Sequence, residues 1–124
     1  MAIRKGASQR IVMLIDDDED ARTTMSELLT TRGYSILEAE NGKEAIEVLT
    51  KAPQLPMLLI LDMAMPVLDG RGFLRRRAQD PILREIPVVV VSASEPPTLF
   101  EGIEGFLRKP VEVTRLLQMI GRYR

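Results

Sequence analysis

Three short apolar runs limit the fold of this chain more than any other feature of its sequence. They occupy residues 11–15, 57–61 and 87–91. None of them alternates with polar residues, which is the pattern of strands that are buried on both faces of a sheet. Segments with helical spacing separate the runs, and alternating strands and helices indicate right-handed βαβ units. The sequence therefore predicts a parallel sheet covered by helices on both faces.

The same alternation places the remaining elements. Two shorter strands are expected at residues 34–37 and 105–107, and helices at about 21–32, 42–50, 70–78 and 113–120. Residues 92–104 contain two prolines and a glycine, which leaves room for about one or two helical turns. We expect residues 1–10 to be a flexible leader and residues 11–124 to form one domain, a doubly wound five-stranded α/β fold whose fourth helix is short or degenerate.

The composition removes several kinds of chemistry. The 124 residues include no cysteine and no histidine, which excludes disulfides, thiolate nucleophiles, zinc–thiolate sites and an internal phosphohistidine. A formal net charge of −1 gives no general attraction to nucleic acid or acidic membranes. The apolar runs are far shorter than the ~20 residues of a membrane-spanning helix. We expect a cytoplasmic protein that binds neither nucleic acid nor membrane, with Arg75, Arg76 and Arg77 mostly on a solvated helix face.

Polar residues follow the predicted strands at the points where those strands end. Asp16 and Asp17 follow the first strand, Asp62 the third, Ser92 the fourth and Lys109 the fifth. The carboxyl ends of parallel strands meet at one edge of the sheet, so we expect these side chains to converge there. Three carboxylates without a cation would repel one another strongly. Their oxygen ligands fit Mg²⁺ (or Mn²⁺) and argue against zinc or copper.

A hydroxyl and an amine beside such a metal site indicate phosphoryl chemistry. With a bound ion, Lys109 and Ser92 can each hold one phosphoryl oxygen while the ion holds a third. A carboxylate can itself accept a phosphoryl group as a nucleophile. The strand-end residues therefore predict a site at which a phosphoryl group is transferred to an aspartate.

Four short segments resemble the receiver domain of bacterial two-component response regulators. They read Ile15-Asp-Asp-Asp18, Asp62-x-x-Met-Pro-x-x-Asp-Gly70, Val91-Ser-Ala93 and Lys109-Pro110, in that order and spacing. The resemblance covers residues 11 to about 122. It implies the flavodoxin-like (CheY-like) fold with strand order 2-1-3-4-5.

The resemblance also implies roles for the strand-end residues. Asp62 is similar to the phosphoacceptor of the family. Asp17 and Asp62 match its direct Mg²⁺ ligands, with the backbone carbonyl of Ala64 as the third, and Asp16 would act through a metal-bound water. Lys109 would pair with Asp62 and then with the phosphoryl group.

Further positions carry implied roles in switching and in dephosphorylation. Ser92 is similar to the hydroxyl residue that moves toward the phosphoryl group, and Phe106 to the switch aromatic of the family. Pro110 is expected to follow a cis peptide bond. Ala64 and Ser94 stand at the positions that tune the rate of hydrolysis.

We therefore expect a phosphoacceptor signalling module. A histidine kinase or a histidine phosphotransfer protein would supply the phosphoryl group to Asp62, and the change would alter binding to a downstream protein target. The chain would not be an enzyme for a separate substrate, because it would catalyse only its own phosphorylation and dephosphorylation.

Three other interpretations stay open at the level of sequence. The same fold could act as a pseudo-receiver, a binding module that is never phosphorylated. Asp16-x-Asp18 after a strand also resembles haloacid-dehalogenase-type phosphatases, in which Asp16 would be the nucleophile. Finally, Asp16, Asp18, Asp20 and Glu27 have the spacing of a calcium-binding loop, although Ala21 stands where that loop needs glycine.

Overall fold

A single parallel sheet forms the centre of the molecule. The computed structural model describes residues 10–63, 69–93 and 103–122. Within these ranges, five strands pair in parallel in the order β2-β1-β3-β4-β5. The strands are β1 (Ile11–Ile15), β2 (Ser35–Ala39), β3 (Leu58–Asp62), β4 (Val88–Ser92) and β5 (Gly105–Arg108). The predicted fold class and strand order are confirmed.

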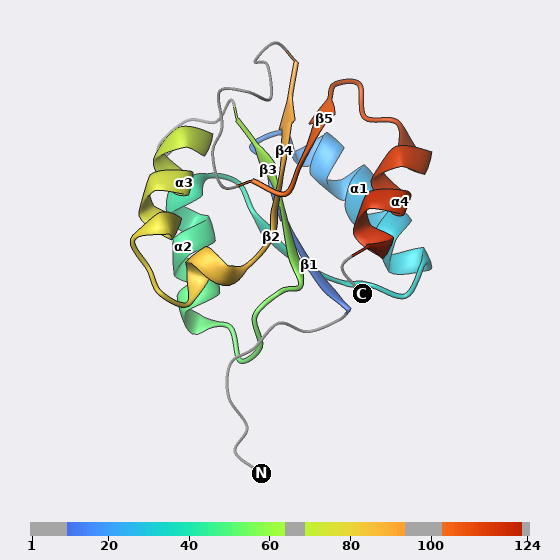
Figure 1. Cartoon of the computed structure of the whole chain (residues 1–124). Helices are drawn as coiled ribbons and strands as arrows, with labels where there is room; N and C mark the ends of the chain where they lie inside the picture. The colour runs from blue at the N-terminus through green and yellow to red at the C-terminus, as the bar shows by residue number, and fades with distance from the viewer. Residues whose placement is uncertain (1–9, 64–68, 94–102, 123–124) are drawn as a thin grey trace.

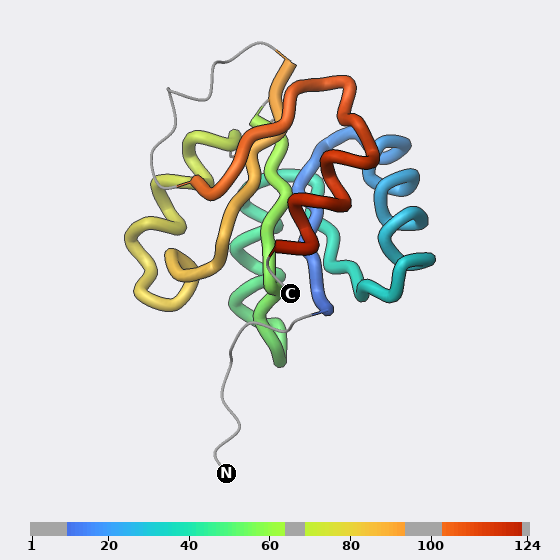
Figure 2. The backbone as a smooth tube through the Cα atoms, turned by 45° about the vertical axis from the view of Figure 1, so that its right-hand side comes forward, coloured from blue at the N-terminus to red at the C-terminus, as the bar shows by residue number. Residues whose placement is uncertain are grey.

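Helices cover both faces of this sheet (Figure 1). In Figures 1 and 2, α2 and α3 lie on one face, and α1 and the C-terminal helix α4 lie on the other. The helices are α1 (Glu19–Thr31), α2 (Gly42–Lys51), α3 (Gly70–Ala78), the short 3₁₀ helix η1 (Leu83–Glu85) and α4 (Val113–Gly121). No helix in the described part of the chain is long and apolar enough to cross a membrane.

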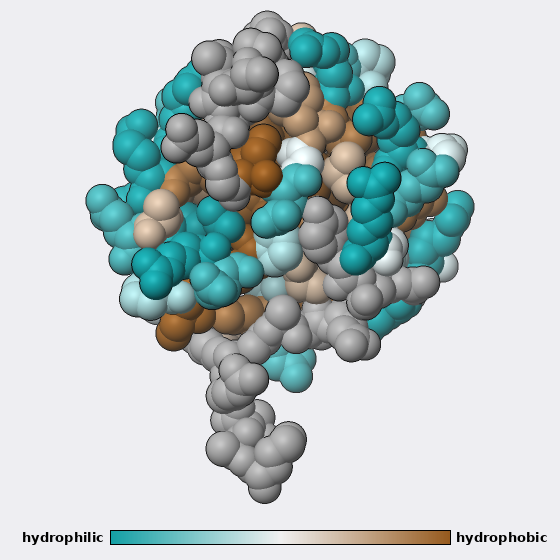
Figure 3. Space-filling view, in the orientation of Figure 1, coloured by the Kyte–Doolittle hydropathy of each residue, from teal (hydrophilic) through white to brown (hydrophobic). Residues whose placement is uncertain are grey.

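Each face of the sheet has its own hydrophobic core. Met13, Leu59 and Val90 point toward α2 and α3, whereas Val12, Leu58 and Val89 point toward α1 and α4, and all six are fully buried. Burying such a side chain contributes roughly 1.5–3 kcal/mol. Figure 3 shows hydrophilic residues over the helical layers and hydrophobic residues between them, along the sheet edge on the side drawn. The apolar runs are therefore continuous because both faces of the central strands are covered.

Side-chain caps decide where the first three helices begin. Asp18, Asn41 and Asp69 precede α1, α2 and α3, and each accepts a hydrogen bond from the backbone N–H three residues later, at 3.2, 2.8 and 2.8 Å. Such caps satisfy donors that have no partner inside the helix. At the other end of α1, Gly33 has a φ of +91°, a conformation that favours glycine. The predicted turn at residue 33 and helix start at residue 42 are thus explained by local chemistry.

Some element boundaries differ from those expected. β2 begins at Ser35 and runs to Ala39, because Tyr34 leaves the strand and packs in the core at 7% exposure. On the last helix, Val113 is 44% exposed and Met119 completes the buried stripe instead.

The calcium-loop interpretation is wrong, since α1 begins at Glu19 and leaves no twelve-residue loop.

Arg77 does not lie on a solvated face, in contrast to Arg75 and Arg76. Its residue exposure is only 7%, and its Nη2 donates to the carbonyls of Arg84 and Ile86 at 3.0 and 2.7 Å. Arg84 lies in η1 and Ile86 directly follows it, so Arg77 joins α3 to the segment that leads into β4. Helical spacing gave a signal for this difference, because Arg77 lies four residues after the buried Phe73 and therefore on the same face of α3.

Several predicted features lie outside the described residues. They are residues 1–9 of the leader, Ala64, Ser94 and most of the segment expected to hold the short fourth helix. Arg10, assigned to the leader from sequence, donates from Nε to the carbonyl of Gly33 at 3.2 Å. The domain boundaries remain a prediction.

Gly70 should be required for the stability of the end of β3. A Cβ at this position would lie 2.7 Å from the Cα of Met63 and 3.1 Å from the backbone oxygen of Asp62. Backbone atoms cannot yield as the tip of a side chain can, so Gly70→Ala should lower the free energy of unfolding by about 1–3 kcal/mol. Urea denaturation would measure this difference.

Gly121→Ala is the matched control for that experiment. Apart from its chain neighbours and the backbone of its own helix, no atom of the described residues lies within 4 Å of a Cβ built at Gly121, at the end of α4. The same chemical change should leave stability unchanged or raise it by up to about 1 kcal/mol. Equal losses from both substitutions would contradict the importance of the close approach at Gly70.

Candidate functional site

Strand alternation places the main site residues on one side of the sheet. Asp62 is the last residue of β3 and follows the parity of Leu58 and Ile60, which face α1 and α4. Asp16 follows β1 directly and Lys109 follows β5 directly. All three line a cleft of about 510 Å³ between α1 and the segment that leads into α4. The parallel sheet therefore brings residues from three distant parts of the chain to one edge, as predicted.

The predicted carboxylate cluster is present. Asp16, Asp17 and Asp62 each offer a carboxylate oxygen, and these atoms all lie within 4.8 Å of one another. Asp62 is buried, Asp16 is half-buried and Asp17 is exposed. Every side-chain ligand in this cluster is an oxygen, which suits a hard divalent cation such as Mg²⁺. These side chains therefore fit the metal that the sequence predicted, whereas the Ala64 carbonyl lies outside the described residues.

Lys109 forms an ion pair with the buried carboxylate of Asp62. Its Nζ lies 3.3 Å from Oδ1 of Asp62, and the side-chain exposures are 38% and 5%. The backbone N–H of Lys109 donates to the carbonyl of Ser92 at 3.0 Å, which ties the end of β5 to the end of β4. The Lys109–Pro110 peptide bond is cis, so the prediction for Pro110 is confirmed.

Ser92 lies at the end of β4 and Phe106 lies within β5 opposite Val90, and both belong to the other face of the sheet. Ser92 is the last residue of β4, is 3% exposed and follows the parity of Val88 and Val90. Phe106 on β5 is half-buried against the core that α2 and α3 cover, with the Arg108 guanidinium 5.5 Å from its ring centroid. Their proposed roles in switching remain predictions.

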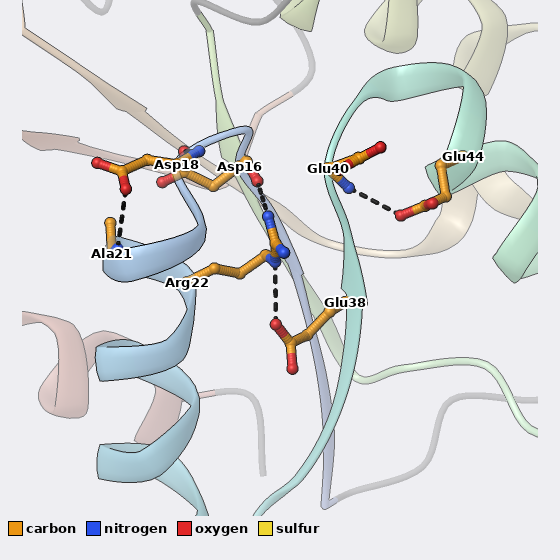
Figure 4. Close-up of polar contacts among 7 residues, drawn as sticks. All are labelled: Asp16, Asp18, Ala21, Arg22, Glu38, Glu40 and Glu44. Atoms are coloured by element: carbon orange, nitrogen blue, oxygen red, sulfur yellow. Dashed lines mark hydrogen bonds and ion pairs between the residues drawn. The ribbon is translucent and has the colours of Figure 1, made fainter.

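The turn from β1 to α1 is held by polar contacts that the sequence did not reveal (Figure 4). The backbone N–H of Asp16 donates to the carbonyl of Ala39 at 3.0 Å, and its Oδ1 accepts from the N–H of Asp18 at 2.9 Å. Arg22 donates from Nη1 to the carbonyl of Asp16 at 2.7 Å and pairs through Nε with Glu38 at 2.9 Å. Arg22 and Glu38 come from α1 and β2, so only the packed fold brings them together.

The position of Asp16 perturbs its ionisation. Burial raises the pKa of Asp16 to about 6 from an ordinary value of 3.8. The Asp18 N–H bond opposes this shift, the charge of Asp62 adds to it, and the charge of Lys109 opposes it. Without a cation, the ionised form of this carboxylate is therefore disfavoured in the folded protein.

This ionisation should make the metal-free protein less stable as the pH rises. The pKa of Asp16 is higher in the folded protein than in the unfolded chain, so the protonated carboxyl stabilises the folded state. This contribution to the free energy of unfolding is fully present below the unfolded pKa of 3.8 and is lost as the pH rises through about 6. Urea midpoints measured in a chelator should fall between about pH 4 and pH 6. Asp16→Asn should remove most of this decline, and saturating Mg²⁺ should suppress it in the unaltered protein. An unchanged slope in Asp16→Asn would contradict the assignment.

Comparison with known proteins shows the family and the fold. The chain matches the family model of the response regulator receiver domain over residues 12–121. It is 36% identical over 116 residues to the two-component response regulator ORR3 of Oryza sativa subsp. indica, covering 90% of this chain and 88% of that protein. The structure is similar to that of Vibrio cholerae chemotaxis protein CheY4, with a TM-score of 0.82, 26% identity and coverage of 94% and 100% of the two chains.

A further solved structure shares the fold at lower identity. The receiver domain of the sensor histidine kinase PA1611 from Pseudomonas aeruginosa PAO1 gives a TM-score of 0.83 at 21% identity, covering 94% of this chain and 98% of that one. A magnesium ion is coordinated in the active-site cleft of that protein. The matched family model, the similarity to a curated regulator and the strand-end carboxylates together show that this chain belongs to the response regulator receiver domain family.

Proposed function

We propose that this chain accepts a phosphoryl group on Asp62 from a phosphohistidine of a partner protein and thereby switches its binding to a downstream protein. The observation that carries the proposal is the contact between Lys109 and a buried Asp62 beside two further carboxylates. A nucleophilic carboxylate, a neighbouring ammonium and a cluster able to hold a divalent cation are the parts that phosphoryl transfer to an aspartate requires.

Each residue of the site has a distinct part in the proposed step. Asp16, Asp17 and Asp62 would hold Mg²⁺, which when bound would neutralise charge on the transferred phosphoryl oxygens. An oxygen of Asp62 attacks phosphorus, the bond from phosphorus to the donor imidazole breaks, and the imidazole nitrogen keeps the electron pair. Lys109 then exchanges its contact with Asp62 for one with the phosphoryl group.

The phosphorylated state differs from the unmodified one mainly in charge. The phosphoryl group of an acyl phosphate carries about −1.5 to −2 charges in place of the single charge of the carboxylate, and it brings strong acceptor oxygens beside the ends of β4 and β5. In the proposal, Ser92 and Phe106 respond to that charge. Attack of water on phosphorus later breaks the bond to Asp62 and releases inorganic phosphate, which resets the switch.

The partners and setting follow from this chemistry. The chain contains no histidine, so the phosphohistidine must come from a histidine kinase or a histidine phosphotransfer protein. We propose that these partners meet it in the cytoplasm. The chain would catalyse only its own modification and its reversal, and would turn over no separate substrate.

Asp62 should be the residue that is phosphorylated. Incubation with acetyl phosphate and Mg²⁺ should add one phosphoryl group to the protein, seen by intact mass spectrometry, and Asp62→Asn should abolish the gain. A chelator should abolish it in the unaltered protein too.

The same experiment separates the two competing functions. A pseudo-receiver would gain no phosphoryl group from acetyl phosphate or from a phosphorylated histidine phosphotransfer protein. A dehalogenase-type phosphatase would hydrolyse a small phosphate ester, would lose that activity in Asp16→Asn and would keep it in Asp62→Asn. Either result would overturn the proposed function.

Lys109 should speed the transfer through its charge. Lys109→Gln should slow phosphorylation by acetyl phosphate by about 100-fold, the scale measured when one group that stabilises developing charge is removed. Lys51→Gln, on the exposed end of α2, is the matched control and should leave the rate unchanged. Stopped time courses read by intact mass would give both rates, and equal rates for the two variants would exclude this role for Lys109.

A further inference from the structure

We propose that Arg22 is a positioning residue for the divalent cation site. Its side chain would fix the turn from β1 to α1 so that the carboxylates of Asp16 and Asp17 keep the places that a cation needs. The inference rests on the proposed metal-dependent function, and it assigns a task to a residue that does not belong to the carboxylate cluster itself.

The Arg22 guanidinium holds two partners from different elements (Figure 4). Nη1 donates to the backbone carbonyl of Asp16 at 2.7 Å, and Nε pairs with Oε1 of Glu38 at 2.9 Å. The Arg22 side chain is only 14% exposed, whereas that of Glu38 is 42% exposed. Glu38 lies on β2, an edge strand of the sheet, so Arg22 braces the turn against a part of the fold that does not form the site.

The bond to the Asp16 carbonyl acts on Asp17 as well. This carbonyl lies in the same rigid peptide plane as the N–H of Asp17, so fixing its direction also limits the direction of the Asp17 side chain. The N–H of Asp16 already donates to Ala39, and its Oδ1 already accepts from Asp18. The contact with Arg22 therefore adds a direct restraint on the peptide that joins the two acidic residues.

An arginine suits this task better than another cation would. The planar guanidinium presents donors in fixed, divergent directions, and can hold a carbonyl and a carboxylate at once. The single ammonium of a lysine has no such fork. Glu38 also offsets the positive charge of Arg22, which would otherwise oppose a cation bound nearby.

Charge and position predict opposite effects when Arg22 is replaced. Arg22→Met keeps an unbranched, apolar stem but removes the charge and both donors. If Arg22 acted only through its charge, this loss would tighten binding of Mg²⁺, because one positive charge near the site is removed. If Arg22 positions the turn, the loss should weaken binding by about 10-fold, the scale for residues that orient metal ligands.

Calorimetric titration of the purified, unphosphorylated protein with Mg²⁺ tests the proposal. We expect Arg22→Met and Arg22→Lys to weaken Mg²⁺ binding. In NMR spectra of the metal-free variants, the amide resonance of Asp17 should shift, whereas the amide resonances of β3 should keep their positions. Arg22→Lys keeps the charge, so it also serves if Arg22→Met fails to fold.

Arg10→Met is the matched control. Arg10 also donates to backbone carbonyls, those of Arg32 and Gly33, but at the opposite end of α1. Its replacement should lower thermal stability and leave the affinity for Mg²⁺ unchanged.

Each result has a defined meaning. Unchanged or tighter binding in either folded Arg22 variant would overturn the positioning role, and so would an equal loss in Arg10→Met. Absence of Mg²⁺ binding in the unaltered protein would instead remove the metal from the proposed function, and the positioning role with it. Binding in the unaltered protein together with equal binding in both Arg22 variants would leave the proposed function intact and reject only this inference.

Discussion

The burial of Asp62 at the end of a central strand is the constraint on which the rest of the structure depends. A carboxylate that is 4% exposed is costly unless it has a partner of opposite charge. Lys109 is such a partner at 3.3 Å, and it can reach Asp62 because β5 and β3 lie on either side of β4 and end at the same edge. Two more carboxylates from the β1–α1 turn add negative charge at this place. The single ammonium of Lys109 does not balance the three carboxylates. This excess of negative charge would favour the binding of a cation, and a bound cation would in turn favour a phosphoryl group.

The surrounding fold holds this charged edge in place from several directions. The end of β3 can lie close to the start of α3 because Gly70 has no side chain, since a Cβ there would meet Met63 and the backbone oxygen of Asp62. The β1–α1 turn is held through its backbone by β2 and through the guanidinium of Arg22. The end of β5 is tied to β4 by the bond from Lys109 to Ser92. Different neighbours therefore restrain the three strand ends that meet at the site, where Asp16, Asp62 and Lys109 line the cleft together with apolar side chains of α1 and the sheet.

Much of this could be predicted from the sequence, and the reasons are local. Runs such as Leu58–Leu61 are continuous because both sides of the strand are covered, so the pattern alone implies a two-faced parallel sheet. Asp18, Asn41 and Asp69 mark helix starts through bonds that span three residues. By contrast, helical spacing places Arg77 on the face of Phe73, but only the packing of α3 near η1 supplies the carbonyls of Arg84 and Ile86 that allow its guanidinium to be buried. Val113 fits the helical stripe as well as Met119 does, and its exposure depends on how α4 is rotated against the sheet.

The sequence by itself determined the class of fold and the chemical types that meet at its edge, because strand periodicity and strand ends are properties of short segments. It also excluded a phosphohistidine within the chain itself, since the chain has no histidine. Only the tertiary structure decided how far apart Asp16, Asp17, Asp62 and Lys109 stand, that burial raises the pKa of Asp16, and that Arg22 from α1 and Glu38 from β2 brace the turn. These features arise from contacts between residues remote in the chain, and no local pattern encodes the distance or the burial that such contacts produce.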